Sequence, residues 1–448
     1  MSAAPASADP FHYDGYDVDP QTGRLACRYS VGSRQFVEEL RLGPGGDWGS
    51  PGVGPAARLV FLLAGVSYYK TAAPSVIDLG AFPLSPAEHD LLRLFYREGL
   101  AEFSYRNHLD LSDLRIEAGR SDPLPVPLGA AGVDHPLVPF GGGIDSIVTV
   151  ESVKARHPRA ALFVVSHAGS RFEAIEAAAS ATGLPCVRAE RAVDPQVLRS
   201  AELGFLNGHV PVTGIISAVA VLAAVLHGHD AVVMSNERSA DVGSHLPSGH
   251  TVNHQFSKSL EFEEALRRVL EETFEPPVAY FSLLRPHSEL WVASRFAALE
   301  RYHPVFRSCN RAFAIDPSRR LDQWCGRCDK CCFIDLVLAP FLGADELDGI
   351  FGGHEPLRDA SLAGQFRALL GAESTSKPFE CVGEVDECRT ALRLAARRAD
   401  RQGNLLLLSL VDELPDELPD VDLATERLLT PHGQHHVPDA FTTDHLLV

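Results

Sequence analysis

Three consecutive glycines followed by an acidic and a hydroxyl residue form the first candidate site. Consecutive glycines let backbone N–H groups turn toward an anion, and a following helix N-terminus adds its dipole. A serine hydroxyl can donate to a phosphate oxygen, and a carboxylate can hold Mg²⁺. The alternative is a plain glycine-rich turn. The residues concerned are Gly141, Gly142, Gly143, Asp145 and Ser146.

This loop differs from the other common phosphate-binding loop. A Walker-type loop needs Gly-Lys followed by Ser or Thr, and the chain contains no Gly-Lys pair. The apolar LVPF before the glycines and the helical IVTVESVKA after them supply a strand and a helix on the two sides. The pattern therefore predicts a nucleotide-phosphate site of a different type.

Four cysteines with metal-ligand spacing form the second candidate site. They are Cys309, Cys325, Cys328 and Cys331. Cysteines separated by two residues can direct their thiolates toward one Zn²⁺ ion in a tetrahedral arrangement. Such a site would stabilise an irregular segment. An iron–sulfur cluster and free thiols are the alternatives. We expect structural zinc, with Cys332 packed inward as a spare.

Composition narrows the class of protein. The chain has 448 residues, with 59 acidic against 40 basic residues and a net charge of −19. This charge repels nucleic acids and anionic lipids, so we expect neither as a partner. The N-terminal residues have no basic and apolar signal pattern, and the apolar run 210–226 is too short to span a bilayer. We expect a cytoplasmic protein in which this run is a buried helix.

The order of the elements predicts an α/β fold. We expect residues 1–19 to be turn-rich, a hairpin around Gly32 and a helix from Ser85 to Glu98. From Leu137, apolar strands alternate with helices, which predicts a doubly wound parallel sheet with ligands at the carboxyl ends of the strands. At such an end, Asn236 and Glu237 are candidates for binding ribose or Mg²⁺.

The predicted domain organisation has five parts. They are an N-terminal α+β domain (1–120), a linker (121–136), a nucleotide-binding domain (137–300), a Cys-rich helical segment (301–401) and an acidic tail (402–448). We expect helices from residue 261 to about 300. The tail is interpreted either as mobile or as a segment that wraps around the protein.

The sequence GGGIDS resembles the PP-loop of the ATP pyrophosphatase family, usually Ser-Gly-Gly-x-Asp-Ser. This resemblance implies the PP-loop fold, ATP with Mg²⁺, and transfer of AMP to an oxygen with release of diphosphate. Two positions depart from the family pattern: Gly141 replaces Ser, and Ile144 occupies a position that is often Lys. An ammonium directed at phosphate must then come from elsewhere or be replaced by Mg²⁺.

Seven blocks together resemble the UDP-N-acetylmuramoyl-L-alanyl-L-glutamate epimerase family. They are VSYYKTAAP, GLAEFSYRN, GGGIDS, NGHVPVTG, SNERSAD, NHQFSKS and KPFECVGEVDE, in this order from residue 66 to residue 387. The resemblance implies ATP-dependent inversion of the terminal L-glutamate of a UDP-muramoyl dipeptide in peptidoglycan precursor synthesis. It also implies these substrate-binding residues: Lys70, Arg106, Asn207, Arg238 and Lys377.

Such an inversion needs an activated carboxylate and groups that move a proton. Adenylation removes the charge that would oppose loss of the α-proton, and Cys, His or Lys then serve as base and acid. A cysteine near an ammonium can have a lowered pKa. Beside Asp145 of the loop, the catalytic candidates are Cys381, His209, His254 and Lys258. The alternatives are a buried core cysteine and structural or substrate-binding histidines.

Two other functions compete with this one. The first is another adenylating PP-loop enzyme that forms an amide or a nitrile. The second is a non-catalytic nucleotide-binding regulator, which Ile144 and Gly141 favour. The sequence makes no prediction about the oligomeric state.

Overall fold

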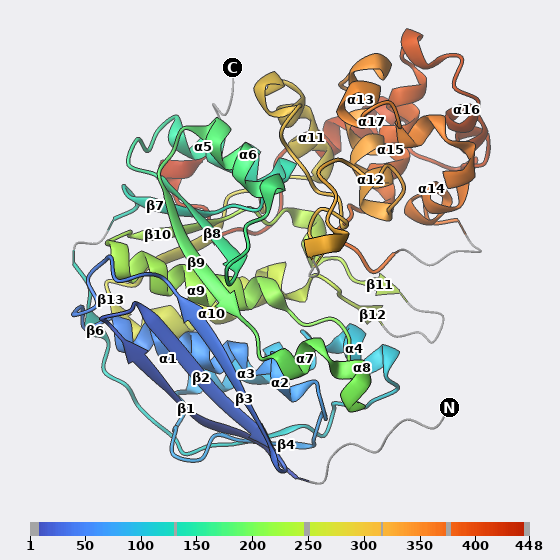
Figure 1. Cartoon of the computed structure of the whole chain (residues 1–448). Helices are drawn as coiled ribbons and strands as arrows, with labels where there is room; N and C mark the ends of the chain where they lie inside the picture. Colours follow the sequence, from blue (N-terminus) through green and yellow to red (C-terminus); the bar gives the residue numbers. More distant parts are fainter. Residues whose placement is uncertain (1–8, 130–131, 246–250, 315–316, 373–377, 443–448) are drawn as a thin grey trace.

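One ten-stranded sheet runs through the N-terminal and central parts of the chain (Figure 1). The computed structural model describes residues 9–129, 132–245, 251–314, 317–372 and 378–442. In spatial order the strands are β14 (Ala279–Ser282), β10 (Ala231–Met234), β7 (Pro136–Pro139), β8 (Ala161–His167), β9 (Cys186–Ala192), β3 (Arg34–Arg41), β2 (Arg24–Val31), β1 (Phe11–Asp19), β4 (Val76–Asp78) and β5 (Arg115–Glu117). The pairings from β14 to β9 are all parallel. The structure therefore confirms an α/β protein with a parallel-rich sheet.

Two short pairs of strands lie outside this sheet. In the first, β6 (Val126–Pro127) pairs in parallel with β13 (Phe274–Glu275). In the second, β11 (Ser244–His245) pairs antiparallel with β12 (Thr251–Val252). The first pair ties the segment between the N-terminal and central parts to the chain beyond α10 (Leu260–Thr273).

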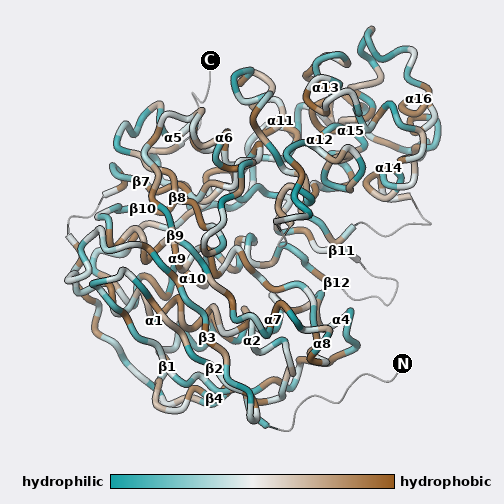
Figure 2. Tube along the Cα trace, viewed as in Figure 1, coloured by the Kyte–Doolittle hydropathy of each residue, from teal (hydrophilic) through white to brown (hydrophobic). Residues whose placement is uncertain are grey.

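Alternate side chains of the parallel strands point into two separate cores. Leu137 and Val232 belong to one core, and Val138 and Val233 belong to the other. A strand buried on both faces needs apolar residues at every position, which explains the unbroken apolar runs in the sequence. In Figure 2 the central strands show brown, hydrophobic stretches, and so does the long helix at 212–227 that packs against them.

Helices cover both faces of the parallel strands (Figure 1). On one face lie α1 (Val53–Ala64), α9 (Val212–His227) and α10, and on the other lie α5 (Ile144–Lys154), α6 (Glu173–Thr182) and α11 (Glu289–Ala297). The remaining helices of the first two-thirds of the chain are α2 (Val66–Tyr69), α3 (Pro86–Arg97), α4 (Ala101–Arg106), α7 (Pro195–Leu198) and α8 (Ser200–Leu203).

The N-terminal elements extend the same sheet. The predicted hairpin is confirmed by the pairing of Val31 with Arg34 across Gly32, and Ser85 begins α3 with a capping box to Glu88. The prediction of a turn-rich start was wrong for 11–19, where apolar residues alternate with polar ones in β1. Because β3 pairs antiparallel with β9, this region and the central region share one sheet.

The apolar run at 210–226 is a buried helix, as predicted. It forms α9, whose residues from Gly214 to Leu226 are almost all buried between the sheet and α1. Among the described residues, no helix combines the length and the apolar character needed to cross a bilayer.

Helices of the last third gather beside the sheet in Figure 1. They are α12 (Asp329–Leu338), α13 (Ala344–Ile350), α14 (Ala363–Leu369), α15 (Val385–Ala396), α16 (Leu405–Asp412) and α17 (Val421–Leu429). The acidic tail wraps onto the protein: Ser288 Oγ donates to the carbonyl of Leu428 at 2.7 Å, and the N–H of His432 donates to the carbonyl of Pro286 at 3.0 Å. Of the two interpretations of the tail, the wrapping segment describes it through residue 442.

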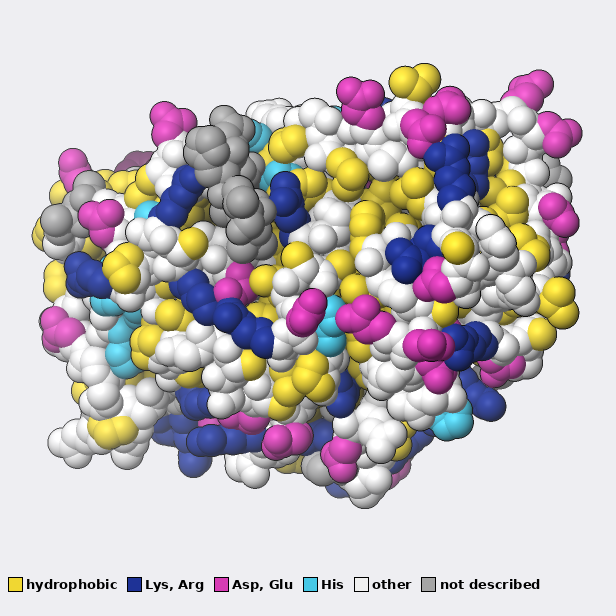
Figure 3. Space-filling model, turned by 90° about the horizontal axis from the view of Figure 1, so that it is seen from above, with side chains coloured by type: hydrophobic (Ala, Val, Ile, Leu, Met, Phe, Trp, Pro, Cys, Tyr) yellow, Lys and Arg dark blue, Asp and Glu magenta, His cyan; other side chains and the backbone are white. Residues whose placement is uncertain are grey.

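The surface charge is mixed on the face drawn in Figure 3. Basic and acidic side chains are interspersed there with apolar and neutral ones. Despite the net charge of −19, the described residues on this face therefore show no single continuous acidic patch.

Candidate functional site

The glycine loop joins β7 to α5, as the sequence predicted. Gly142 has a left-handed φ of 75°, and a Cβ at this position would lie 2.9 Å from the carbonyl oxygen of Ala174. Gly143 is the N-cap residue of α5. Because glycine has no side chain, it cannot offer a side-chain acceptor to the N–H groups of the first helical turn. Ser146 Oγ donates to the carbonyl of Gly143 at 3.1 Å. The loop therefore presents a helix N-terminus suited to an anion.

Replacing Gly142 by alanine should disrupt this loop, whereas the same change at Gly141 should not. The left-handed φ and the contact with the Ala174 carbonyl together should cost about 1–3 kcal/mol of folding free energy. Nothing lies within 4 Å of a Cβ built on Gly141. Urea unfolding of the two variants measures the difference. Equal stabilities would show that the loop does not hold this conformation.

Three carboxylates meet beside the loop, of which Asp145 is partly buried and the other two are buried. Asp145, Glu237 and Glu289 follow the carboxyl ends of β7, β10 and β14, which are neighbours in the sheet, and one oxygen from each lies within 4.8 Å of the others. Within the described chain, Asp145 Oδ1, Glu237 Oε2 and Glu289 Oε2 are buried without a hydrogen-bond partner. Such unpartnered carboxylate oxygens fit a hard divalent cation such as Mg²⁺.

Burial and mutual repulsion both raise pKa values in this carboxylate cluster. Burial and the Glu237 carboxylate raise the pKa of Asp145 to about 6. Burial and the neighbouring Asp145 raise the pKa of Glu289 well above its usual range. Like charges at this spacing oppose one another, and a cation would relieve that repulsion.

The sequence interpretation missed Glu289 because it placed only helices after residue 261. Residues 279–282 instead form β14, an edge strand that pairs in parallel with β10. The next residues then reach the same edge of the sheet as Glu237, and Ser288 caps the helix that begins at Glu289. The short apolar AYFS at 279–282 was the available signal.

Two lysines supply the positive charge that the loop itself lacks. Ile144, at the position often occupied by lysine in PP-loops, is packed in the core with 1% exposure. Lys258 and Lys330 instead act on Asp145, where both lower its pKa against the opposing effect of burial. Arg285, itself buried, donates to the carbonyls of Glu237 and Lys258 at 3.1 and 2.5 Å and so fixes both segments. Lys330 was not a predicted site residue, although lysine is rare in this chain.

A thiol and an imidazole form the second part of the site. Cys381 and His254 lie within hydrogen-bonding reach of each other, and the rings of His254 and His209 are 4.1 Å apart. Burial alone would raise the pKa of Cys381, but Lys258, His254 and Lys330 outweigh it and lower this pKa to about 7. Burial alone would lower the pKa of His254, but Cys381 and Glu102 raise it to about 9. The pair is therefore poised near neutral pH to exist as thiolate and imidazolium.

Lys258 connects the two parts. The groups that raise its pKa, against burial, are Cys381, Glu237, Asp145 and Glu289, in that order. His209 differs from His254, because burial and the neighbouring imidazole lower its pKa to about 4. At neutral pH the site thus holds a charged lysine and an uncharged His209.

The predicted substrate-binding residues divide into three groups. Lys70 donates to Asn207 Oδ1 at 2.8 Å and to the carbonyl of Gly208 at 3.1 Å, next to His209. Burial and the nearby Arg191 lower the pKa of Lys70 to about 8. Arg106 lies 5.2 Å from the centre of the Phe379 ring, near Cys381. Arg238 directly follows Glu237, and its guanidinium contacts His432 at 2.9 Å. Lys377 is outside the described residues.

The four predicted cysteine ligands converge on one point. Their sulfurs all lie within 4.8 Å of one another, with Cys331 3.6 Å from Cys325 and 3.4 Å from Cys328. Zn–S bonds of about 2.3 Å in a tetrahedron place sulfurs about 3.8 Å apart. The spacing thus fits a single tetrahedral ion better than a cluster of several irons, which would hold the thiolates further apart. Cys332 is buried outside this quartet.

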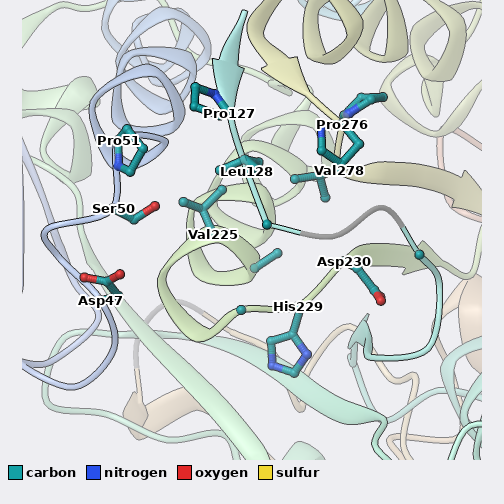
Figure 4. A pocket seen from close by; sticks show the side chains of 15 residues that line it. Asp47, Ser50, Pro51, Pro127, Leu128, Val225, His229, Asp230, Pro276 and Val278 are labelled. Atoms are coloured by element: carbon teal, nitrogen blue, oxygen red, sulfur yellow. The ribbon is translucent and has the colours of Figure 1, made fainter.

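A pocket of about 400 Å³ lies at the opposite edge of the sheet (Figure 4). His229 and Asp230 line it just before β10, and Val278 lines it just before β14. Asp230 accepts hydrogen bonds from the N–H groups of Asp134 and His135, which gives this carboxylate a structural role. Among the described residues that line this pocket, none is a predicted site residue.

The parallel-rich sheet, the carboxylate cluster and the thiol–imidazole pair define an α/β enzyme with groups suited to proton transfer. The chain matches the family models described as the MurL N-terminal domain over residues 2–283 and the MurL C-terminal domain over residues 305–425. It therefore belongs to the MurL family of UDP-N-acetyl-alpha-D-muramoyl-L-alanyl-L-glutamate epimerases.

Curated relatives agree with this assignment. Proteins of Xanthomonas oryzae pv. oryzae and Salinispora tropica are each 39% identical, over 94% and 97% of this chain and 94% of their own lengths. A protein of a Micromonospora species is 39% identical over 97% of both chains. All three are named UDP-N-acetyl-alpha-D-muramoyl-L-alanyl-L-glutamate epimerase, an isomerase activity. No solved structure matches this chain.

Proposed function

We propose that the protein is an ATP-dependent epimerase of the PP-loop type. It adenylates the terminal carboxylate of UDP-MurNAc-L-Ala-L-Glu, inverts L-glutamate to D-glutamate and releases AMP and diphosphate, in the cytoplasm, as a step of peptidoglycan precursor synthesis. The observation that carries this proposal is that Arg285 holds the segments of Glu237 and Lys258 together by hydrogen bonds to both carbonyls. The carboxylates beside the glycine loop and the thiol of Cys381 all raise the pKa of this lysine. Activation and proton transfer are thereby adjacent.

The glycine loop side of the site would bind ATP. Its phosphates would lie at the N-terminus of α5, with Ser146 as a further donor and with Asn236 and Glu237 at the adjacent strand end. Asp145, Glu237 and Glu289 would hold Mg²⁺, which when bound neutralises phosphate charge. The ammonium groups of Lys258 and Lys330 reinforce that positive field.

The thiol side of the site would move the proton. Once the glutamate carboxylate is an acyl-adenylate, the Cys381 thiolate can take the α-proton, and the electron pair of the C–H bond passes into the activated carbonyl. A proton returned to the other face gives the D-glutamyl adenylate, and water then cleaves its acyl–phosphate bond to give the free D-glutamate carboxylate and AMP. His254, His209 and Lys258 are the groups near Cys381 that can handle that proton.

Structural zinc would hold the cysteine quartet. Lys330 directly follows the loop of Cys325 and Cys328 and donates to the carbonyl of Cys381. The metal would therefore fix an ammonium and a catalytic thiol at the same time, without touching the substrate.

Isotope exchange tests the function. The protein is incubated with ATP, Mg²⁺ and the L-glutamyl muramoyl dipeptide nucleotide in D₂O, and the products are measured by mass spectrometry. We expect deuterium at the glutamate α-carbon together with AMP and diphosphate. AMP without deuterium would support another adenylating enzyme instead, and absence of both would support a nucleotide-binding regulator.

A further inference from the structure

Glu102 belongs to the proton-transfer group although it was not among the predicted site residues. Its side chain is 5% exposed and contacts His254 Nδ1 through Oε2. Its other oxygen, Oε1, accepts from Arg106 Nε at 2.5 Å. Both carboxylate oxygens are thus engaged, and the carboxylate is fixed from two sides.

This contact determines what His254 can do. Because Glu102 occupies Nδ1, the other ring nitrogen of His254 is the one left for the thiol of Cys381. A buried carboxylate at Nδ1 orients the ring and stabilises its protonated form, as the third group of a catalytic triad does. The ring of the neutral His209 is tilted by 40° to the His254 ring, with 4.1 Å between the ring centres, and restricts its movement.

We propose that Glu102 is a positioning residue that holds His254 as an imidazolium and thereby keeps Cys381 as the thiolate that removes the α-proton. The order Glu102, His254, Cys381 is a carboxylate–imidazole–thiol relay assembled from α4, from the segment before α10 and from the segment before α15. The inference rests on the proposed function for its catalytic meaning, but the ion pair itself exists without substrate.

Other charged groups near this relay also shift the pKa values of its members. Lys258 and Lys330 favour the thiolate, and burial opposes it. Burial raises the pKa of Glu102, but His254, His209 and Arg106 together outweigh burial and lower this pKa below its usual range. Glu380 lies near His254, where its charge also favours the imidazolium, and it accepts from Asn310 Nδ2 at 2.8 Å. Glu102 is distinguished by its direct contact with the ring.

The free protein tests the proposal without ATP or substrate. Iodoacetamide alkylation of the Cys381 peptide is followed by mass spectrometry from pH 5 to pH 10. In the wild type the midpoint should lie near pH 7. Glu102→Gln keeps a hydrogen-bond acceptor but removes the charge, so the midpoint should rise by about one pH unit, with about tenfold slower alkylation near pH 6.

A matched control separates this effect from a general loss of structure. Glu346→Gln removes the carboxylate that contacts His303 Nδ1 at 2.9 Å, in the helical C-terminal region, and should leave the Cys381 midpoint unchanged. Glu102→Asp, which retains the charge, should restore part of the wild-type midpoint. An unchanged midpoint in Glu102→Gln would overturn the proposal.

Turnover gives an independent readout. The acid limb of the kcat/KM profile for epimerisation should move upward by the same amount in Glu102→Gln, while the KM for ATP stays unchanged. If Glu102→Gln fails to fold, His254→Asn must raise the alkylation midpoint, and an unchanged midpoint there would overturn the proposal. Since alkylation needs no substrate, failure of the relay and failure of the epimerase assignment are distinguishable.

Discussion

Replacing Cys381 by alanine should lower deuterium incorporation at the glutamate α-carbon by about 10²- to 10⁴-fold, the usual contribution of a positioned acid or base. Release of AMP should continue, because the change leaves the glycine loop and the carboxylate cluster of Asp145, Glu237 and Glu289 in place. An adenylate that cannot be deprotonated can still be hydrolysed. The two rates are measured in the same D₂O reaction by mass spectrometry and by AMP quantification.

The control for this prediction is Cys186→Ala. Cys186 is a partly buried thiol in β9, and burial raises its pKa, so it has no thiolate character to lose. Its removal should change neither rate by more than about twofold. Deuterium exchange that persists in Cys381→Ala would exclude this thiol as the base and shift that role to His209, His254 or Lys258.

The sequence predicted the parts of the site that local pattern encodes. The strand–loop–helix around Gly141 to Ser146 and the cysteine spacing are local, so both could be found before any fold was known. Neighbouring parallel strands end at one edge, which also brought Glu237 to Asp145 as expected. These predictions needed only the period of the apolar residues and the positions of glycine and cysteine.

Residues that depend on tertiary packing were missed. Glu102 lies in a six-residue helix with no distinguishing pattern, and its role arises only from contact with His254, 152 positions away. Glu289 required the four-residue strand β14 to be recognised, and such a short apolar run can equally begin a helix. Lys330 required the Cys-rich segment to fold back on Cys381. Contacts between residues far apart in the chain produce no periodic pattern in the sequence.

Loss of one ligand of the cysteine quartet should disturb both stability and catalysis. Cys331 is fully buried and lies 3.4–3.6 Å from two of its partners. In small zinc domains the metal contributes on the order of 10 kcal/mol to folding. We therefore expect Cys331→Ala to lose its zinc, measured by elemental analysis, and to unfold its C-terminal helices at a much lower temperature, measured by circular dichroism.

The adjacent Cys332 provides the matched control, since it is equally buried but stands outside the quartet. Cys332→Ala should keep about one zinc per chain and lose only about 1 kcal/mol, because it removes a small buried group. The helix that carries both residues begins at Asp329, and its Lys330 donates to the carbonyl of Cys381. Zinc loss should thus also release that lysine and reduce alkylation of Cys381 at neutral pH. Full zinc content in Cys331→Ala would contradict the metal site, whereas zinc loss with unchanged Cys381 reactivity would show that the metal supports the fold without supporting the thiolate.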